Sequence, residues 1–173
     1  MLLPFAGRPE KEWPIEHFRE LAKRLGPKAL VVWGPRERER AAAIGAELAP
    51  ATNLRELARV LRDASIVIGG DTGPLHLAAA LGTRVIGLYG PTNPARNGPY
   101  GQVHRALASP DGTMTGLAVE IVFRAVVDAL GRETSPIGNA SRDGAAGEAS
   151  PSKVQGSASR DGAAGEANPS KVL

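Results

Sequence analysis

The chain contains no cysteine among its 173 residues. This absence excludes disulfide bonds, thiolate metal sites and thiol nucleophiles, and it is compatible with a reducing cytoplasm. No run of about 18 apolar residues occurs, so the sequence predicts no membrane-spanning helix. The first residues also lack the charged segment and the long apolar segment of a signal peptide. We therefore expect a cytoplasmic protein.

Several familiar motifs of nucleotide binding and catalysis are missing too. Neither a Walker A phosphate loop nor a G-x-G-x-x-G turn occurs, which argues against ordinary ATPases and dehydrogenases. No G-x-S-x-G nucleophile elbow is found. The three histidines, His17, His76 and His104, are too dispersed in the sequence to suggest a metal site. We expect no metal and no cofactor.

Charge of either sign is not concentrated anywhere. The 21 basic and 18 acidic residues give a net charge of +3, and the two kinds alternate along the segments that we predict to be helical. This pattern is typical of solvated helix faces and not of a nucleic-acid-binding stripe. The small basic excess would also suit a protein that works near anionic lipid or phosphate, for example at the cytoplasmic face of the inner membrane.

Apolar residues in the first 132 positions follow the spacings of strands and helices in alternation. Ile15, Phe18, Leu21 and Leu25 recur at helical spacing, and Asn53 with Glu56 has the form of a capping box. The expected strands are 2–6, 29–33, 66–68, 85–89 and 103–108, and the expected helical segments are 15–25, 37–48, 54–61, 74–81 and 117–130. A turn is expected at 69–73 and a loop at 90–101.

Short apolar strands joined by helices predict right-handed crossovers and a parallel sheet. We expect an α/β fold in which residues 1–132 form one Rossmann-like domain. The remaining residues, 133–173, contain almost no large apolar side chains, and a 15-residue unit beginning at Ala140 is repeated from Ala158 with one difference. Such a segment cannot bury enough apolar surface to offset its chain entropy, so we predict a disordered tail. A docking peptide is the alternative.

The loops that follow the strands are the expected ligand-binding positions, since ligands bind beyond the carboxyl ends of the strands in such sheets. The turn at 69–73 leads directly into a helix, whose free N–H groups and dipole favour an anion. Thr72 would offer a hydroxyl there, and Gly73 would let a phosphate approach the backbone. The alternative is a plain strand–turn–helix corner in which Asp71 caps the helix.

Three further residues have both a functional and a structural interpretation. His76 lies in the first turn of the same helix and could face the anion site, or it could simply pack and bond a carbonyl. Lys11 follows the first strand and could be a solvated lysine. Glu37 follows the second expected strand, where such folds place a carboxylate on ribose hydroxyls, although a first-turn glutamate favoured by the helix dipole is the alternative.

Three ordered motifs give the sequence a family resemblance. The segment D-T-G-P-L-H-L-A-A-A-L-G-T-R-V-I-G-L-Y-G-P-T-N-P at 71–94 resembles the hallmark segment of glycosyltransferase family nine, the ADP-heptose:lipopolysaccharide heptosyltransferases. K-E-W-P-I-E-H-F at 11–18 is similar to that family's K-x-W-P-x-E-x-F segment, and W-G-P-R-E at 33–37 is similar to its G-P-G-E turn, with Arg36 in place of the second glycine. The resemblance covers nearly all of residues 1–132.

This resemblance implies the C-terminal half of a GT-B glycosyltransferase. Such an enzyme transfers heptose or a related sugar from an ADP-sugar to a lipopolysaccharide-core acceptor, with inversion and without a metal. It further implies that Lys11 contacts the donor phosphates and stabilises the leaving group. Asp71, Thr72, Gly73 and His76 would line the diphosphate and the sugar, and Glu37 would bind the ribose.

The family's first domain, which binds the acceptor and supplies the general base, has no counterpart in this sequence. We therefore expect the isolated chain to be inactive unless a separate polypeptide supplies that half. A non-catalytic or vestigial nucleotide-sugar-binding module is the main alternative function. A Rossmann epimerase-like fold that prefers UDP over ADP is a weaker one.

Overall fold

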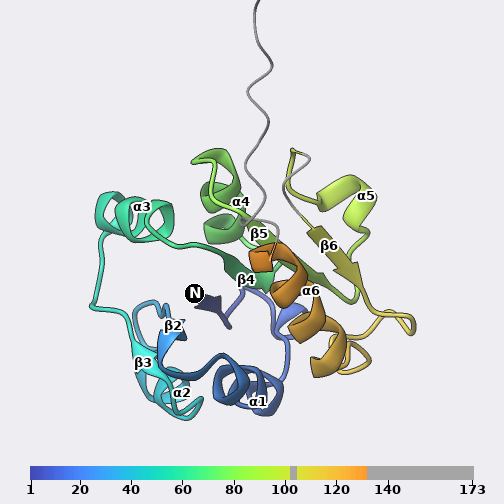
Figure 1. Cartoon of the computed structure of the whole chain (residues 1–173), viewed down its shortest axis with the longest axis horizontal. Coiled ribbons are helices and arrows are strands. Elements are labelled where there is room, and N and C mark those ends of the chain that lie inside the picture. The colour runs from blue at the N-terminus through green and yellow to red at the C-terminus, as the bar shows by residue number, and fades with distance from the viewer. Residues whose placement is uncertain (102–104, 132–173) are drawn as a thin grey trace, which may run out of the picture. The chain divides into compact units, whose positions relative to one another are not determined.

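The computed structural model describes residues 1–101 and 105–131. Both copies of the repeated unit, and the predicted boundary at residue 132, lie outside these residues. Six strands form one sheet with the order β3-β2-β1-β4-β5-β6, and all neighbouring strands are parallel. The expected Rossmann-like parallel sheet is therefore confirmed (Figure 1). The strand order reverses between β1 and β4, where such folds have their binding crevice.

The strands are short and the helices are of moderate length. The strands are β1 (Leu2–Leu3), β2 (Leu30–Val31), β3 (Glu47–Leu48), β4 (Val67–Gly70), β5 (Val85–Tyr89) and β6 (Arg105–Ala108). The α-helices are α1 (Ile15–Leu25), α2 (Arg38–Ala42), α3 (Leu54–Arg62), α4 (Gly73–Ala80), α5 (Pro94–Asn97) and α6 (Val119–Gly131). Two single-turn 3-10 helices, η1 (Pro9–Lys11) and η2 (Gly26–Lys28), flank α1.

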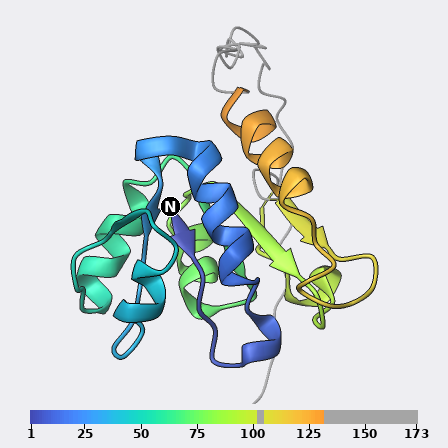
Figure 2. The same cartoon turned by 90° about the horizontal axis from the view of Figure 1, so that it is seen from below.

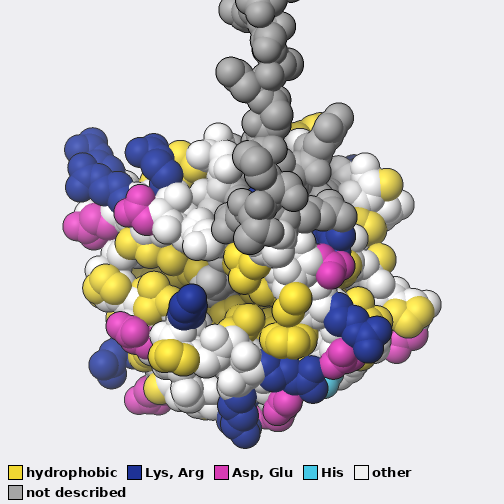
Figure 3. Space-filling model, in the orientation of Figure 1, with side chains coloured by type: hydrophobic (Ala, Val, Ile, Leu, Met, Phe, Trp, Pro, Cys, Tyr) yellow, Lys and Arg dark blue, Asp and Glu magenta, His cyan; other side chains and the backbone are white. Residues whose placement is uncertain are grey.

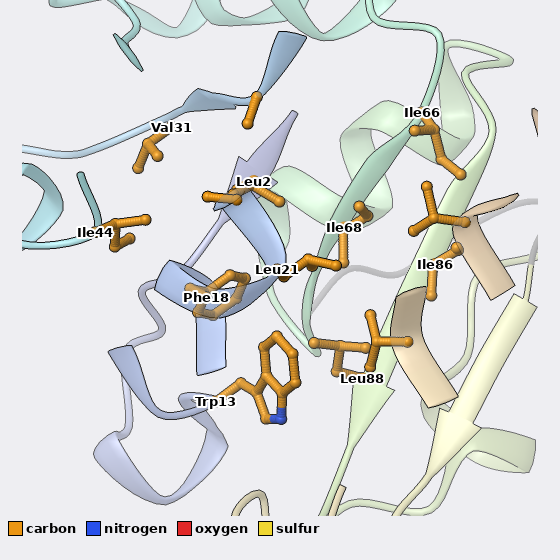
Figure 4. Close-up of a cluster of buried hydrophobic side chains, with 14 of the residues drawn as sticks. Leu2, Trp13, Phe18, Leu21, Val31, Ile44, Ile66, Ile68, Ile86 and Leu88 are labelled. Atoms are coloured by element: carbon orange, nitrogen blue, oxygen red, sulfur yellow. The ribbon is translucent and has the colours of Figure 1, made fainter. Parts of the chain in front are cut away.

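Each face of the sheet is covered by its own apolar core. Alternate residues of the strands point to opposite faces, so Leu2 and Ile68 belong to one cluster while Leu3 and Val67 belong to the other. The first cluster packs under α1, α2 and α6, and Figure 4 shows Trp13, Phe18 and Leu21 meeting the strand side chains there. The second cluster packs under α3 and α4. Helices α1 and α6 lie side by side in both views (Figures 1 and 2).

Most of the expected elements are present with small shifts of their ends. The bounds of α1 and β5 agree with the prediction, and the capping box of α3 forms with both of its hydrogen bonds. The expected helix over 37–48 is confirmed only for its first part, where α2 forms, and is wrong for the rest. It ends at Ala42, a turn with Gly45 at φ +76° follows, and Glu47–Leu48 is the edge strand β3. The expected loop at 90–101 contains the helix α5, which Asn93 caps by accepting from the Ala95 N–H.

The surface carries basic and acidic side chains interspersed around a hydrophobic middle in the view of Figure 3. None of the helices in the described part of the chain is long and apolar enough to cross a membrane.

Candidate functional site

A cleft of about 900 Å³ lies at the carboxyl ends of the central strands. Its walls are the segments that follow β3, β2, β1, β4 and β5, which are neighbours in the sheet in this order. The sequence indicated the loops after the expected strands, and the segment after β3 is an addition, since that strand was not expected. The charged residues that line the cleft are Arg8, Lys11, Glu37, Asp71 and Arg96.

Lys11 and Asp71 form an ion pair in the cleft. The Lys11 ammonium donates to Oδ2 of Asp71 across 2.8 Å, and the two side chains are 21% and 10% exposed. Because the loop after β1 and the end of β4 are adjacent in the sheet, residues 60 positions apart in sequence meet directly. The pair fixes the ammonium at the strand-order reversal.

The backbone of β4 allows Lys11 to come this close. A side chain added at Gly70 would place its Cβ 2.6 Å from the Lys11 carbonyl oxygen, which is closer than real Cβ contacts. The single turn η1 ends at Lys11, whose N–H donates to the Arg8 carbonyl at 3.0 Å. Glycine at position 70 is therefore required by the close approach of the loop that carries Lys11.

The same loop is fastened to helix α2 by Glu12. One carboxylate oxygen of Glu12 accepts the Ala6 N–H at 3.2 Å, and the other pairs with Arg40 at 2.5 Å. The Arg40 guanidinium also lies 4.7 Å from the centre of the Phe5 ring, within the range of a cation–π contact. The loop between β1 and α1 is thus held near both of its ends.

Asp71 accepts hydrogen bonds from several side chains. Besides Lys11, the Asn97 amide donates to Oδ2 and the His76 Nε2 lies near Oδ1, both at 3.1 Å. Burial raises the pKa of Asp71, but the hydrogen bonds from Lys11, Asn97 and His76 outweigh it and bring the pKa down to about 2. Asp71 is consequently an anion near neutral pH, and its lone pairs are committed to neighbouring side chains.

The start of α4 has a polar group without a partner. Thr72 occupies the N-cap position, so the interpretation of Asp71 as the N-cap is wrong. The Thr72 hydroxyl makes no capping bond, and its oxygen is a buried atom without a hydrogen-bond partner although the residue lines the cleft. A Cβ added at Gly73 would meet nothing within 4 Å. The helix start therefore offers open space, free donors and an unsatisfied hydroxyl.

Glu37 lines the cleft from the segment after β2. Its Oε2 accepts the Gly34 N–H at 2.6 Å while its own N–H donates to the Gly34 carbonyl at 3.0 Å. This pair of bonds closes a turn in which Arg36 has φ +73°, the only positive φ of a non-glycine residue in the described ranges. Arg36 occupies the position of the second glycine in the G-P-G-E turn named above, and its backbone has the conformation that glycine adopts without strain.

The predicted site residues are largely brought together. Lys11, Glu37, Asp71, Thr72 and Gly73 all line the cleft, whereas His76 contacts Asp71 without lining the cleft and has a side chain 41% exposed. Trp33 lines the cleft as well as packing, and its indole N–H donates to the Ala49 carbonyl at 2.7 Å.

Sequence reasoning missed Asn97 and Arg96, which come from α5 and line the cleft. Asn97 binds Asp71 through its amide and accepts the Tyr89 hydroxyl at its carbonyl, 3.1 Å away. Burial and the Asp71 charge raise the pKa of Tyr89 to about 12, so this hydroxyl remains a donor. The available signal was the Asn-Pro pair at 93–94, which is typical of a helix start after a strand.

Among residues 1–101 and 105–131, no group of three His, Asp or Glu side chains could hold a metal ion. The positive charge in the cleft comes from lysine and arginine side chains and from the start of α4.

The chain is similar to known heptosyltransferases in sequence and in fold. The chain is 38% identical over 125 residues to lipopolysaccharide heptosyltransferase 1 of Salmonella typhimurium, a match that covers 67% of this chain and 39% of the relative. The structure resembles E. coli heptosyltransferase WaaC solved with ADP, with a TM-score of 0.70, 34% identity and coverage of 74% of this chain and 43% of that one. WaaC solved with ADP-2-deoxy-2-fluoro heptose gives a TM-score of 0.66.

The chain thus spans less than half the length of these relatives. The model of the family described as glycosyltransferase family 9 (heptosyltransferase) matches residues 1–119, from the first strand to the beginning of α6. That range contains every residue of the cleft described above. On this evidence the chain belongs to glycosyltransferase family 9, the heptosyltransferases.

Proposed function

We propose that this chain binds the sugar donor of a heptosyltransferase. The donor is an ADP-sugar whose heptose, or a related sugar, is transferred to a lipopolysaccharide-core acceptor. The observation that carries the proposal is the Lys11–Asp71 pair beside the open start of α4, inside a cleft of nucleotide size. The likeness to WaaC, whose structures contain ADP and an ADP-heptose analogue, supports the same donor class.

The chemistry of transfer explains why this arrangement suits the donor. When the bond between the anomeric carbon and the phosphate oxygen breaks, its electron pair stays on the departing nucleoside diphosphate. An ammonium and a helix N-terminus fixed beforehand at that position stabilise the developing charge. Lys11 is held in place by Asp71, so little reorganisation is needed when the charge appears.

Each predicted site residue has a role in this proposal. Lys11, the Thr72 hydroxyl and the backbone at Gly73 bind the diphosphate, while Glu37 binds the ribose with the carboxylate oxygen that Gly34 does not engage. Asp71 acts mainly by orienting Lys11 and His76, because its oxygens already accept from them. For His76, which contacts Asp71 but does not line the cleft, the proposed role is a contact with the sugar.

Calorimetric titration of the purified full chain with ADP tests the proposal. We expect binding by the parent, loss of binding in a Lys11→Ala/Asp71→Asn double variant, and preference for ADP over UDP. The double variant avoids leaving one buried charge without its partner. Lys23→Ala, which removes an exposed lysine from α1, is the matched control and should bind ADP like the parent. A well-folded parent that does not bind ADP would refute the proposal.

A further inference from the structure

Two arginines at the cleft have no strong counter-ion. Arg96 is exposed, lines the cleft from α5, and makes no side-chain hydrogen bond or ion pair with the described residues. Arg8 contacts Glu10 only at 3.9 Å, and both of those side chains are more than half exposed. Lys11, in contrast, is already paired with Asp71 at 2.8 Å. Arg8 and Arg96 therefore carry the positive charge of the cleft that no close carboxylate of the described residues neutralises, and this charge is available to a bound diphosphate.

The position of Arg96 is set by its neighbour. The Asn97 amide donates to Oδ2 of Asp71, and the Asn97 carbonyl accepts from the fully buried Tyr89. Two hydrogen bonds thus tether the last residue of α5 to the ends of β4 and β5. Arg96, one residue earlier, is kept at the cleft although α5 is only one turn long.

The sheet order indicates which part of the donor Arg96 would meet. The cleft runs past the ends of β3, β2, β1, β4 and β5 in that order, with Glu37 in the segment after β2 and Arg96 in the segment after β5. Lys11 and the start of α4 lie between them. A donor with its ribose near Glu37 and its diphosphate along Lys11 and the start of α4 places its second phosphate on the side of α5, where Lys11 and Arg96 can both approach it.

We propose that Arg96 binds the second phosphate of the nucleoside diphosphate, the one that carries the sugar, and that the Asn97–Asp71 bond holds it there. This inference rests on the proposed donor site and adds a discriminating residue to it. It explains how the cleft would favour a diphosphate over a monophosphate, since the contact with Arg96 is made only when a second phosphate is present.

The test compares ADP with AMP by calorimetric titration of the full chain. For Arg96→Ala we expect ADP affinity to fall about fivefold to tenfold, a modest loss because an exposed arginine is screened by water. The affinity for AMP should change less than about twofold, since AMP lacks the second phosphate. Arg62→Ala, which removes the same charge at the end of α3 outside the cleft, should alter neither affinity.

A second comparison tests the tether. In an Asn97→Ala background, Arg96→Ala should reduce ADP affinity by a smaller factor than in the parent, because α5 is no longer held. Equal losses for ADP and AMP, or no loss for either, would overturn the role of Arg96 while leaving the donor site intact. A parent that binds neither nucleotide would overturn the donor site itself, and this inference with it.

Discussion

The Lys11 ammonium and the Asp71 carboxylate meet at 2.8 Å across the point where the strand order reverses. The pair is mostly buried, and the second oxygen of the carboxylate faces His76. The Asp71 carboxylate loses its hydrogen bonds with Lys11, His76 and Asn97 when the chain unfolds. The pair therefore links the binding cleft to the stability of the fold.

We expect this link to appear as a pH dependence of stability. The folded pKa of Asp71, about 2, is below its ordinary value of 3.8, so the stabilisation is fully present above about pH 4 and is lost as the pH falls through 2. The contribution should be about 2 kcal/mol at neutral pH. Urea denaturation at a series of pH values should show this loss for the parent and a flatter profile for Asp71→Asn. Asp63→Asn, a surface change, should keep the parent profile, and an unchanged profile in Asp71→Asn would contradict the assignment.

Gly70 and Gly73 should respond differently to the same substitution. Gly70→Ala pushes a Cβ against the Lys11 carbonyl, so it should lower the free energy of unfolding by about 2 kcal/mol, as overpacking does, and weaken ADP binding. Gly73→Ala meets no atom of the chain and should change stability by less than about 0.5 kcal/mol. If a phosphate approaches the backbone at Gly73, this second variant should still lose ADP affinity. Chemical denaturation and calorimetric titration of both variants measure the contrast, and full ADP affinity in Gly73→Ala would remove the phosphate from that position.

Arg36 is expected to store strain in the turn before α2. Its left-handed backbone costs about 1 kcal/mol or more in a residue with a Cβ, whereas glycine adopts it freely. Arg36→Gly should raise the free energy of unfolding by about 0.5–1 kcal/mol, after allowance for the greater freedom of glycine in the unfolded chain. Arg36→Ala keeps the strain and serves as the control. Thermal denaturation of the parent, Arg36→Gly and Arg36→Ala measures the difference. An equal rise in the free energy of unfolding in both variants would mean that loss of the guanidinium, and not relief of backbone strain, causes it.

The sequence predicted the fold well where a segment was long enough for its apolar residues to recur at the spacing of a helix or a strand. Helix α1 and strand β5 matched to the residue, and the capping box at Asn53 fixed the start of α3. Strand β3 was missed because two residues cannot show an alternation, and the alanine-rich segment before it continues a helical pattern. Gly45, with φ +76°, was the one sign of the break.

The site was predicted in part for a similar reason. Lys11, Asp71 and Thr72 follow strands within recognisable motifs, so their meeting at one sheet edge could be inferred. Asn97 could not be found in this way, because its role depends on a side-chain contact with Asp71 over 26 residues and on a one-turn helix. The left-handed backbone of Arg36 could not be predicted from the sequence alone. The only sign of it was that Arg36 replaces a glycine of the family's motif.

The 60-residue separation of Lys11 and Asp71 has a kinetic consequence. Parallel strands pair only after a crossover has closed, and contacts this distant in sequence are slow to form because the loop entropy is lost first. ADP would thus bind only to molecules in which the central strands have already paired. When refolding is monitored by tryptophan fluorescence, the fluorescence change should occur before ADP binding recovers or at the same time. ADP binding that recovers first would contradict this expectation.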